Sequence, residues 1–392
     1  MNRRRALQSI LGGAALGIPA LFGTRLTFAD VSPKDELEAS ERKAMAGVAE
    51  EFMRKFEVPG LSVAIAREGV FAYQNAFGFT GRDSRDALST SNLFRIASIS
   101  KPITSATIFS LIEKGQLRQE DKVFGTGSVL GTKYGRQPYA AGIEQITIDH
   151  LLTHAAGGWD NGPDDPMFSN LGMNHAELIS WTLDHQPLKN PPAKVHAYSN
   201  FGYCILGRVI EKITGQPYAD YVQKAILSPC GISDMRIGRN KLKDRAAGEV
   251  TYYEQTGKDP YEMNVTRMDS HGGWIATPSD LVRFATHVDG FDTSRNILKP
   301  ETIRKMTEPE PLNSGYARGW RVNQQGHWWH GGDLPGTNGV LVRTSSHFCW
   351  AALANTYREA GGDMGEALDD MVWEMASKVN GWRKALGLNS AS

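Results

Sequence analysis

LFRIASISKPITS, residues 93–105, is the stretch that decides the fold prediction. Pro102 has no amide hydrogen and fits the first turn of a helix, so a helix is predicted to begin near Ser98. Unpaired N–H groups and the macrodipole at a helix start favour negative charge, such as a serine alkoxide or an oxyanion. Lys101 follows three residues later on the same helical face. Ser98 is therefore a candidate nucleophile with a lysine partner, although a helix cap beside a solvated lysine has the same pattern.

A second polar group is Tyr198-Ser199-Asn200, just before a predicted helix. In an extended segment, residues two positions apart point to the same side, which places the phenol and the amide together. Tyr198 could relay a proton, and Asn200 could bind a substrate carbonyl or fix Lys101. The alternative is a surface turn in which Ser199 or Asn200 caps the helix.

A third group is His330-Gly331-Gly332-Asp333. Two glycines beside a strand allow a ligand backbone to approach closely. Backbone N–H groups in this segment could form an oxyanion hole with the N–H of Ser98. The alternative is a loop that contains a buried histidine.

Other chemistries find little support in the sequence. His327 and His330 are spaced i, i+3, but no third ligand stands out, so no metal site is predicted. The closest approach to GxSxG is residues 60–64, GLSVA, which breaks the pattern and is typical of a strand. HExxH, GxxxxGK[ST] and GxGxxG do not occur, and no cofactor is expected. A Ser-His-Asp triad stays open, because it has no sequence spacing rule.

The order of predicted elements indicates a sheet built from both chain ends, with a helical insertion between them. Strands are expected at 61–66, 70–77, 319–323, 339–343 and 348–354. Helices are expected at 36–57, 103–114, 147–153, 176–187, 201–214, 217–227, 278–289 and 364–379.

Composition describes an ordinary globular chain of 392 residues, 41% hydrophobic and 22% charged, large enough for one domain or two intimate subdomains. Lys plus Arg equals Asp plus Glu at 43 each, so a nucleic-acid partner is not expected. Cys204, Cys230 and Cys349 are odd in number and widely spaced, which predicts neither a zinc knuckle nor a disulfide framework. One bridge stays open for an exported protein.

The N-terminus has the pattern of an export signal, predicted to cover residues 1–29. A basic head at 3–5 precedes an apolar run at 10–22, and its about 13 residues are too few for a membrane span of roughly 20. Cleavage is expected near Ala29, after which no stable membrane insertion is expected. The adjacent arginines suggest twin-arginine export of a folded protein. An ordinary secretory signal or an uncleaved anchor is the alternative. The predicted location is periplasmic or secreted.

SISK at 98–101, YSN at 198–200 and HGG at 330–332 resemble, in order, the three motifs of class C β-lactamase-like serine hydrolases. That family includes class C β-lactamases, D-Ala-D-Ala carboxypeptidases, D-aminopeptidases and family VIII carboxylesterases. The segments VPGLSVAIA at 58–66 and GGWIATPSDLVRF at 272–284 fit as well, and the resemblance covers roughly residues 40–380.

The resemblance implies an α+β fold of the β-lactamase/transpeptidase type. An antiparallel sheet flanked by helices is joined to an all-helical subdomain, with the site in the cleft between them. Residues 30–392 would form one catalytic domain. Its α/β subdomain would comprise about 36–97 and 271–385, and its helical subdomain about 98–270.

The resemblance also implies roles for the motif residues. Ser98 would be the nucleophile, and Lys101 and Tyr198 would share general-base and general-acid duty. The oxyanion hole would be the N–H groups of Ser98 and Asp333. Further substrate contacts would come from Asn200, His330, Gly331 and Gly332. His154 matches a family signature that we take as structural.

The third motif departs from the β-lactamases, which usually carry Lys-Thr-Gly there. His330 is mostly neutral near pH 7, and Gly331 has no hydroxyl, so a substrate carboxylate loses two partners. Arg321 could compensate. The variant favours an esterase for small or medium acyl esters, then a D-amino-acid peptidase or amidase, then a β-lactamase. A non-catalytic scaffold with the same fold is the alternative from another class. The oligomeric state stays open.

Overall fold

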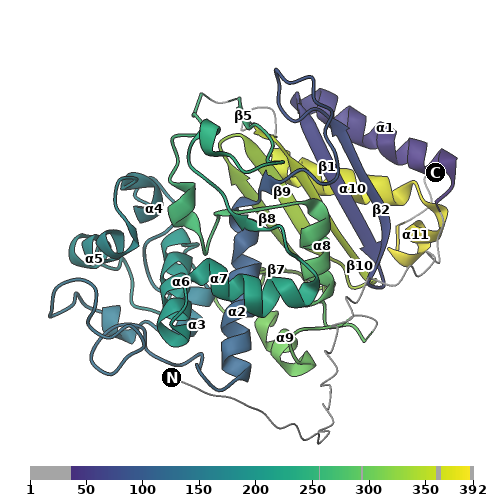
Figure 1. Cartoon of the computed structure of the whole chain (residues 1–392). Coiled ribbons are helices and arrows are strands. Elements are labelled where there is room, and N and C mark those ends of the chain that lie inside the picture. The colour runs from purple at the N-terminus through teal and green to yellow at the C-terminus, as the bar shows by residue number, and fades with distance from the viewer. Residues whose placement is uncertain (1–36, 256, 293–294, 359–362, 389–392) are drawn as a thin grey trace, which may run out of the picture. The chain divides into compact units, whose positions relative to one another are not determined.

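The computed structural model is organised around a six-stranded antiparallel sheet with the strand order β2-β1-β10-β9-β8-β7 (Figure 1). Two strands come from the N-terminal part of the chain and four from the C-terminal part, and they meet where β1 pairs with β10. The prediction of a sheet built from both chain ends is confirmed. The strands are β1 (Gly60–Arg67), β2 (Val70–Gly78), β7 (Arg321–Val322), β8 (Trp328–Leu334), β9 (Thr337–Arg343) and β10 (Phe348–Ala354).

The two faces of the sheet are buried in different cores. Along β1, Leu61, Val63 and Ile65 enter one core, whereas Ala64 and Ala66 enter the other, as the alternation of a strand requires. The first core is closed by α1 (Ala39–Phe56), α10 (Met364–Ser377) and α11 (Asn380–Ala385). The second face carries α8 (Pro278–Thr286), which packs on β1, β9 and β10.

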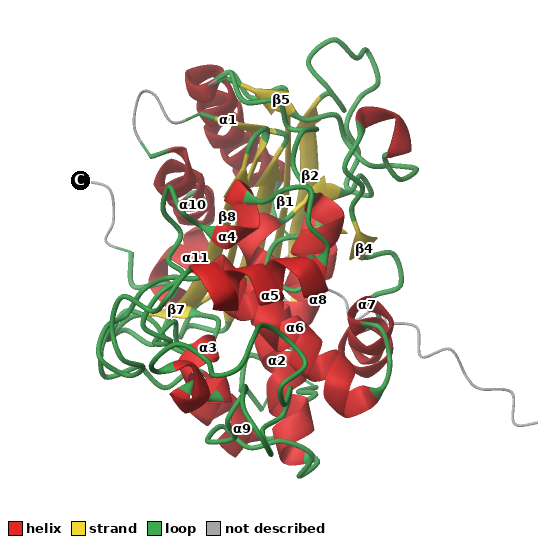
Figure 2. Ribbon diagram, turned by 90° about the vertical axis from the view of Figure 1, so that its left-hand side faces the viewer, coloured by secondary structure: helices red, strands yellow, loops and turns green. Residues whose placement is uncertain are grey.

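The middle of the chain is mainly helical and lies beside the sheet, as Figures 1 and 2 show. Its central helix, α2, is buried along almost its whole length and packs against α6 and α9. The prediction of an α+β fold with a helical part is therefore confirmed. The helices are α2 (Ser100–Glu113), α3 (Ile148–Leu152), α4 (Pro166–Ser169), α5 (His175–His185), α6 (Asn200–Thr214), α7 (Tyr218–Val222) and, later in the chain, α9 (Pro300–Met306).

Two features differ from the expectation. The HGG motif lies within strand β8, which was not predicted, because glycines weaken the strand signal of its sequence. Short strands of two or three residues also occur outside the main sheet, and segments of this length are too short to be predicted from a sequence pattern. β4 (Arg236–Ile237) pairs with β6 (Trp274–Ala276), which also pairs with β3 (Phe94–Arg95), and β5 (Tyr253–Glu254) pairs with β11 (Thr356–Tyr357).

The structure describes residues 37–255, 257–292, 295–358 and 363–388. The predicted signal at 1–29, with its cleavage site, lies outside these residues. Within them, no helix has the length and apolar character that a membrane crossing needs. Cys204, Cys230 and Cys349 are all buried with free thiols.

Candidate active site

Ser98 and Lys101 lie on one continuous turn. A short 3-10 turn, Ala97–Ile99, leads directly into α2, and Pro102 occupies the first turn of that helix as predicted. Lys101 is completely buried, and its Nζ lies 2.9 Å from Ser98 Oγ. The same nitrogen donates to Asn200 Oδ1 at 2.8 Å and to the carbonyl oxygen of His271 at 3.1 Å.

The surroundings of Lys101 favour a neutral amine near pH 7. Burial lowers the pKa of its ammonium to about 7, and the carboxylates of Asp165 and Asp333 partly oppose this effect. A neutral amine has two hydrogens and one lone pair. Because the Asn200 and His271 oxygens can only accept, they take both hydrogens, and the lone pair is left to face Ser98 Oγ. This arrangement suits removal of the serine proton.

The backbone around Ser98 is constrained on two sides. Ala97 has a φ of +47°, a left-handed conformation that costs a residue with a side chain about 1–3 kcal/mol. Strand β8 passes directly beside the same turn. A Cβ added to Gly332 would lie 2.3 Å from the carbonyl oxygen of Ile96 and 3.0 Å from the nitrogen of Ser98. The second glycine of the HGG motif is therefore required by this close approach.

Tyr198 lies just before α6, and Ser199 caps that helix by accepting a hydrogen bond from the N–H of Gly202 at 3.0 Å. The Lys101 Nζ is 4.7 Å from the centre of the Tyr198 ring. Burial raises the pKa of the Tyr198 phenol well above its ordinary value, and a hydrogen bond with Ser98 partly offsets this. The phenol therefore stays protonated and can serve as a proton donor.

Asn200 is held by two acceptors that the sequence reasoning missed. Its Nδ2 donates to Asn161 Oδ1 at 3.0 Å and to Asp165 Oδ2 at 2.9 Å. Both amide hydrogens are thus used, and the amide oxygen is directed to Lys101. Asp165 is completely buried, and burial raises the pKa of its carboxyl group to about 6.

His330 is at the cleft, but its ring is buried in a chain of hydrogen bonds. The N–H of Ser199 donates to His154 Nδ1 at 3.0 Å, so the neutral His154 ring carries its proton on Nε2, which donates to the Tyr316 hydroxyl at 3.0 Å. His330 Nδ1 donates to the carbonyl oxygen of Gly331 at 2.6 Å, so Tyr316 donates to His330 Nε2 at 3.3 Å. Burial lowers the pKa of His330 to about 3, with Lys101 adding to the effect. Both ring nitrogens are therefore committed within the protein.

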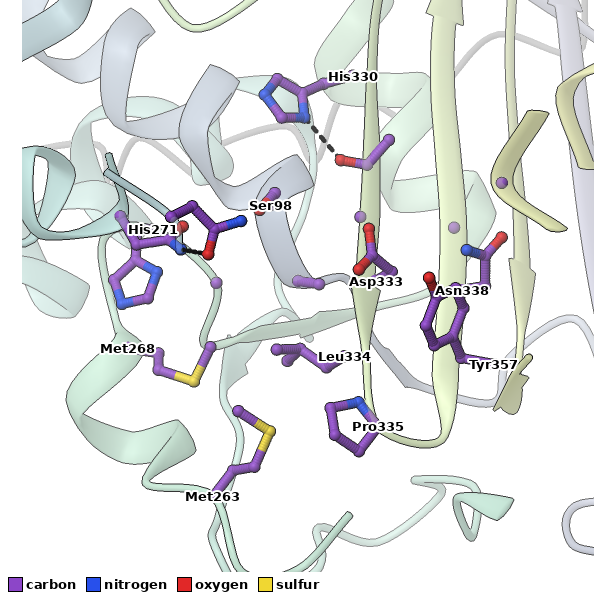
Figure 3. Close-up of a pocket in the computed structure, with 18 of the residues that line it drawn as sticks. Ser98, Met263, Met268, His271, His330, Asp333, Leu334, Pro335, Asn338 and Tyr357 are labelled. Carbon is purple, nitrogen blue, oxygen red and sulfur yellow. Dashed lines mark hydrogen bonds between the residues drawn. The ribbon is translucent and has the colours of Figure 1, made fainter. Parts of the chain in front are cut away.

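Strand β8 presents an edge to the cleft beside Ser98. In the described part of the chain, β7 covers this edge only at Trp328 and Trp329, and the segment from His330 onward has no strand on that side. Asp333 lies on this segment, and its side chain lines the pocket in Figure 3. A substrate carbonyl placed against the edge can reach backbone N–H groups of both the strand and the Ser98 turn.

The cleft has a volume of about 1290 Å³. The structure brings every predicted site residue to it, with Lys101 directly behind Ser98 and Asn200. One wall is apolar, and Figure 3 shows Met263, Met268, Leu334 and Pro335 together on that wall. Arg321 and Lys258 supply the basic side chains among the lining residues. No group of three or more His, Cys, Asp or Glu side chains suited to a metal ion occurs among the residues that the structure describes.

The structure gathers Ser98, Lys101 and Tyr198 at one cleft, an arrangement suited to a serine hydrolase that acts through an acyl-enzyme. The chain belongs to the beta-lactamase family: the family model described as Beta-lactamase matches residues 45–370. The resemblance drawn from the three motifs is thereby confirmed.

Two relatives extend the comparison. Penicillin-binding protein 4* of Bacillus subtilis (strain 168) is 27% identical over 344 residues, which cover 79% of this chain and 71% of that protein. Protein flp of Staphylococcus aureus (strain MRSA252) is 24% identical over 336 residues, which cover 83% of this chain and 65% of flp. The chain thus spans less than two thirds of the length of flp.

Solved structures agree on the fold. D-amino acid amidase from Ochrobactrum anthropi SV3, complexed with L-phenylalanine amide, superposes with a TM-score of 0.71 at 20% identity, covering 88% of this chain and 99% of that chain. The octameric penicillin-binding protein homologue from Pyrococcus abyssi gives 0.69 at 22% identity, covering 88% and 79%.

Proposed function

We propose that this protein hydrolyses small amides or short peptides through an acyl-enzyme on Ser98. The observation that carries the proposal is the position of Lys101. Its buried Nζ lies 2.9 Å from Ser98 Oγ, while Asn200 and His271 hold its other contacts. The lone pair of the neutral Lys101 amine then faces Ser98 Oγ and can accept the serine proton.

Acylation then follows from the geometry. Ser98 Oγ attacks the substrate carbonyl carbon as its proton passes to Lys101 Nζ, and the carbonyl oxygen becomes an oxyanion. The N–H groups of Ser98 and Asp333 are the proposed donors to that oxyanion. When the tetrahedral intermediate collapses, Tyr198 protonates the leaving amine and regains a proton from Lys101.

Deacylation repeats the same steps with water. A water molecule takes the place of the leaving group beside Tyr198 and attacks the acyl carbon. Tyr198 accepts the proton of the water as its own proton passes to Lys101 Nζ. Lys101 then returns that proton to Ser98 Oγ as the acid product leaves. No residue outside the three proposed catalytic groups has to transfer a proton.

The position of the proton donor sets the direction of the substrate. The leaving group must lie near Tyr198, whose ring centre is 6.3 Å from that of His330. The acyl group then points the other way along β8, towards Leu334 and the methionines Met263 and Met268 (Figure 3). This apolar wall supports a substrate with an apolar acyl group.

Two observations favour amides and peptides. A phenol that stays protonated is the acid that an amine leaving group needs, since amines depart poorly without a proton. Arg321 lines the cleft near His330 and could bind a carboxylate on the leaving group. The names of the amidase and the penicillin-binding proteins among the similar proteins agree with this substrate class.

Ester hydrolysis is the second candidate, and the third motif favours it. His330 is buried with both nitrogens committed, and Gly331 offers no hydroxyl, so this motif gives no charged group for a substrate carboxylate. β-Lactam hydrolysis ranks third for the same reason.

We also propose that residues 1–29 direct export of the protein. We further propose that the catalytic domain divides at the boundaries predicted from the sequence, with an α/β subdomain of about 36–97 and 271–385 and a helical subdomain of about 98–270.

Intact-mass spectrometry after treatment with a fluorophosphonate probe tests the proposal. The wild-type protein should gain one adduct, and Ser98→Ala should gain none while keeping its thermal unfolding temperature. D-phenylalanine amide, p-nitrophenyl butyrate and nitrocefin then separate the three substrate classes. An unlabelled, folded wild-type protein, or full turnover by Ser98→Ala, would refute Ser98 as the nucleophile.

A further inference from the structure

Asp165 lies between the wall of the cleft and the buried lysine. We propose that Asp165 is a positioning residue. It holds the amide oxygen of Asn200 towards Lys101, and it connects Asn200 to helix α4, which lines the part of the cleft where the acyl group is expected to bind. The proposal rests on the proposed function, because it treats Lys101 as the acceptor of the Ser98 proton.

Both carboxylate oxygens of Asp165 are used. Oδ2 accepts from Asn200 Nδ2 at 2.9 Å, and Oδ1 accepts from the N–H of Met167 at 2.8 Å. The side chain is completely buried, so neither oxygen can exchange its partner for bulk water. Because the two donors approach different oxygens, a side chain with a single acceptor oxygen here would leave one of them without a partner.

The orientation of Asn200 follows from its acceptors. An amide can turn over and exchange its oxygen and nitrogen, and the turned amide would present N–H groups to Lys101. Asp165, with Asn161 Oδ1 at 3.0 Å, holds the NH₂ group on the opposite side. The oxygen therefore stays 2.8 Å from Lys101 Nζ.

The second oxygen of Asp165 anchors a wall of the cleft. It caps α4, and Phe168 on this helix and Leu171 just after it line the cleft. Arg267 holds the same segment by donating to the carbonyl oxygen of Met167 at 2.7 Å. An acyl group that packs against this segment therefore acts on the residue that orients Asn200.

The negative charge of Asp165 affects the pKa of Lys101 and therefore the pH dependence of activity. Its carboxylate raises the pKa of Lys101 against the lowering effect of burial. The other charged or titratable groups here are Asp333, whose carboxylate also raises the pKa of Lys101, Asp160, whose carboxylate raises the pKa of Asp165, Arg267, and three buried histidines. Burial lowers the pKa of each of these histidines, so they are neutral above pH 7: His154, His271 and His330. Removing the Asp165 charge should lower the pKa of Lys101, so the neutral amine persists to lower pH.

Asp165→Asn is the direct test. The variant keeps the size of the side chain but has one acceptor oxygen, so it cannot serve both Met167 and Asn200. We expect kcat/KM to fall about 10- to 100-fold at pH 8, and the acid limb of kcat/KM to move to lower pH. We also expect the preference for a phenylacetyl over an acetyl substrate to shrink. Asp184→Asn is the matched control, since it removes the same charge from a carboxylate paired with Arg136.

The outcomes are distinct. A lower rate with an unshifted acid limb means that Asp165 is only structural and overturns the proposal, and so does wild-type behaviour. An unchanged acyl preference overturns the link to the cleft wall. If Asp165→Asn does not fold, Asn200→Leu removes the amide that links Asp165 to Lys101. The variant also takes an acceptor away from the Lys101 ammonium, so the acid limb should again move to lower pH. The profiles are measured on protein whose Ser98 labelling has been verified, so a failure of the proposed function shows itself first in the probe experiment.

Discussion

Gly332 and Ile96 lie so close together that no side chain fits between them. A Cβ on Gly332 would lie 2.3 Å from the Ile96 carbonyl oxygen, a backbone atom that cannot swing away. The same point is 3.0 Å from the Ser98 nitrogen. The distance between strand β8 and the turn that carries Ser98 thus depends on the absence of one methyl group.

Gly332→Ala should separate the strand from the turn. Overpacking of this kind costs about 1–3 kcal/mol, and the displaced strand should also reduce kcat. Gly331→Ala is the control, because the atom nearest to its Cβ is the Gly339 oxygen at 3.8 Å. Thermal unfolding and kcat/KM of the two variants, measured side by side, check the expectation. Equal behaviour of the two alanine variants would contradict it.

Tyr198→Phe should reveal the proton donor through the leaving group. Loss of general acid catalysis typically costs about 10²- to 10⁴-fold in rate. We expect this loss in full in kcat/KM for D-phenylalanine amide and a much smaller loss in kcat/KM for p-nitrophenyl butyrate. The reason is that kcat/KM reports the steps up to release of the leaving group, and p-nitrophenolate leaves without a proton. Steady-state kinetics of the wild-type protein and the variant with both substrates measures these losses. An equal loss for both substrates would rule out Tyr198 as the proton donor to the leaving group.

The acid limb of kcat/KM should reflect Lys101. Burial lowers the pKa of its ammonium to about 7, so the proton acceptor is neutral above this pH and charged below it. Activity should therefore fall as the pH drops below about 7. Above pH 7 this group should leave activity level until other groups titrate. A profile that is flat from pH 5 to pH 8 would contradict a neutral Lys101 as the base.

Arg321→Gln should affect substrates that carry a carboxylate. We expect KM to rise about 10- to 100-fold for a dipeptide, because a charge-assisted hydrogen bond of about 1.5–3 kcal/mol is lost. The corresponding peptide amide, which has no carboxylate, should be unaffected. Lys258→Gln removes the other basic side chain of the cleft and serves as the comparison. If both substrates respond alike to Arg321→Gln, a carboxylate contact is excluded.

Tyr316→Phe should cut the buried hydrogen-bond chain between His154 and His330. Both rings would lose a partner inside the protein, at a cost of about 1–3 kcal/mol for each unsatisfied group. Denaturant unfolding measures the loss of stability. Tyr139→Phe, which removes a half-buried hydroxyl that donates to the Tyr134 carbonyl, should cost clearly less.

Much of the fold could be predicted because its long strands are continuous apolar runs, buried on both faces, and its helices have clear ends. Strands β1, β9 and β10 are long, and Pro102 and Pro278 mark the starts of two helices. β8 could not be predicted in the same way. Gly332 in this strand is explained by the approach to Ile96, a contact that only the assembled fold creates.

In the site, too, some residues could be predicted from the sequence and others could not. Ser98, Lys101, Tyr198 and Asn200 could be proposed from local motifs, and the structure places them around one hydrogen-bonded lysine. Asp165, the His271 carbonyl and Tyr316 carry no local signal. Their contacts join residues between 14 and 170 positions apart in the sequence, and only tertiary packing brings them together.

The three buried free thiols have a consequence for how the protein can be made. None of Cys204, Cys230 and Cys349 is joined to another, so the described fold needs no oxidant to mature. A reducing cytosol, without disulfide catalysts, should suffice to produce it in folded form. The same independence would let a nascent chain reach its native state before it meets any transport machinery.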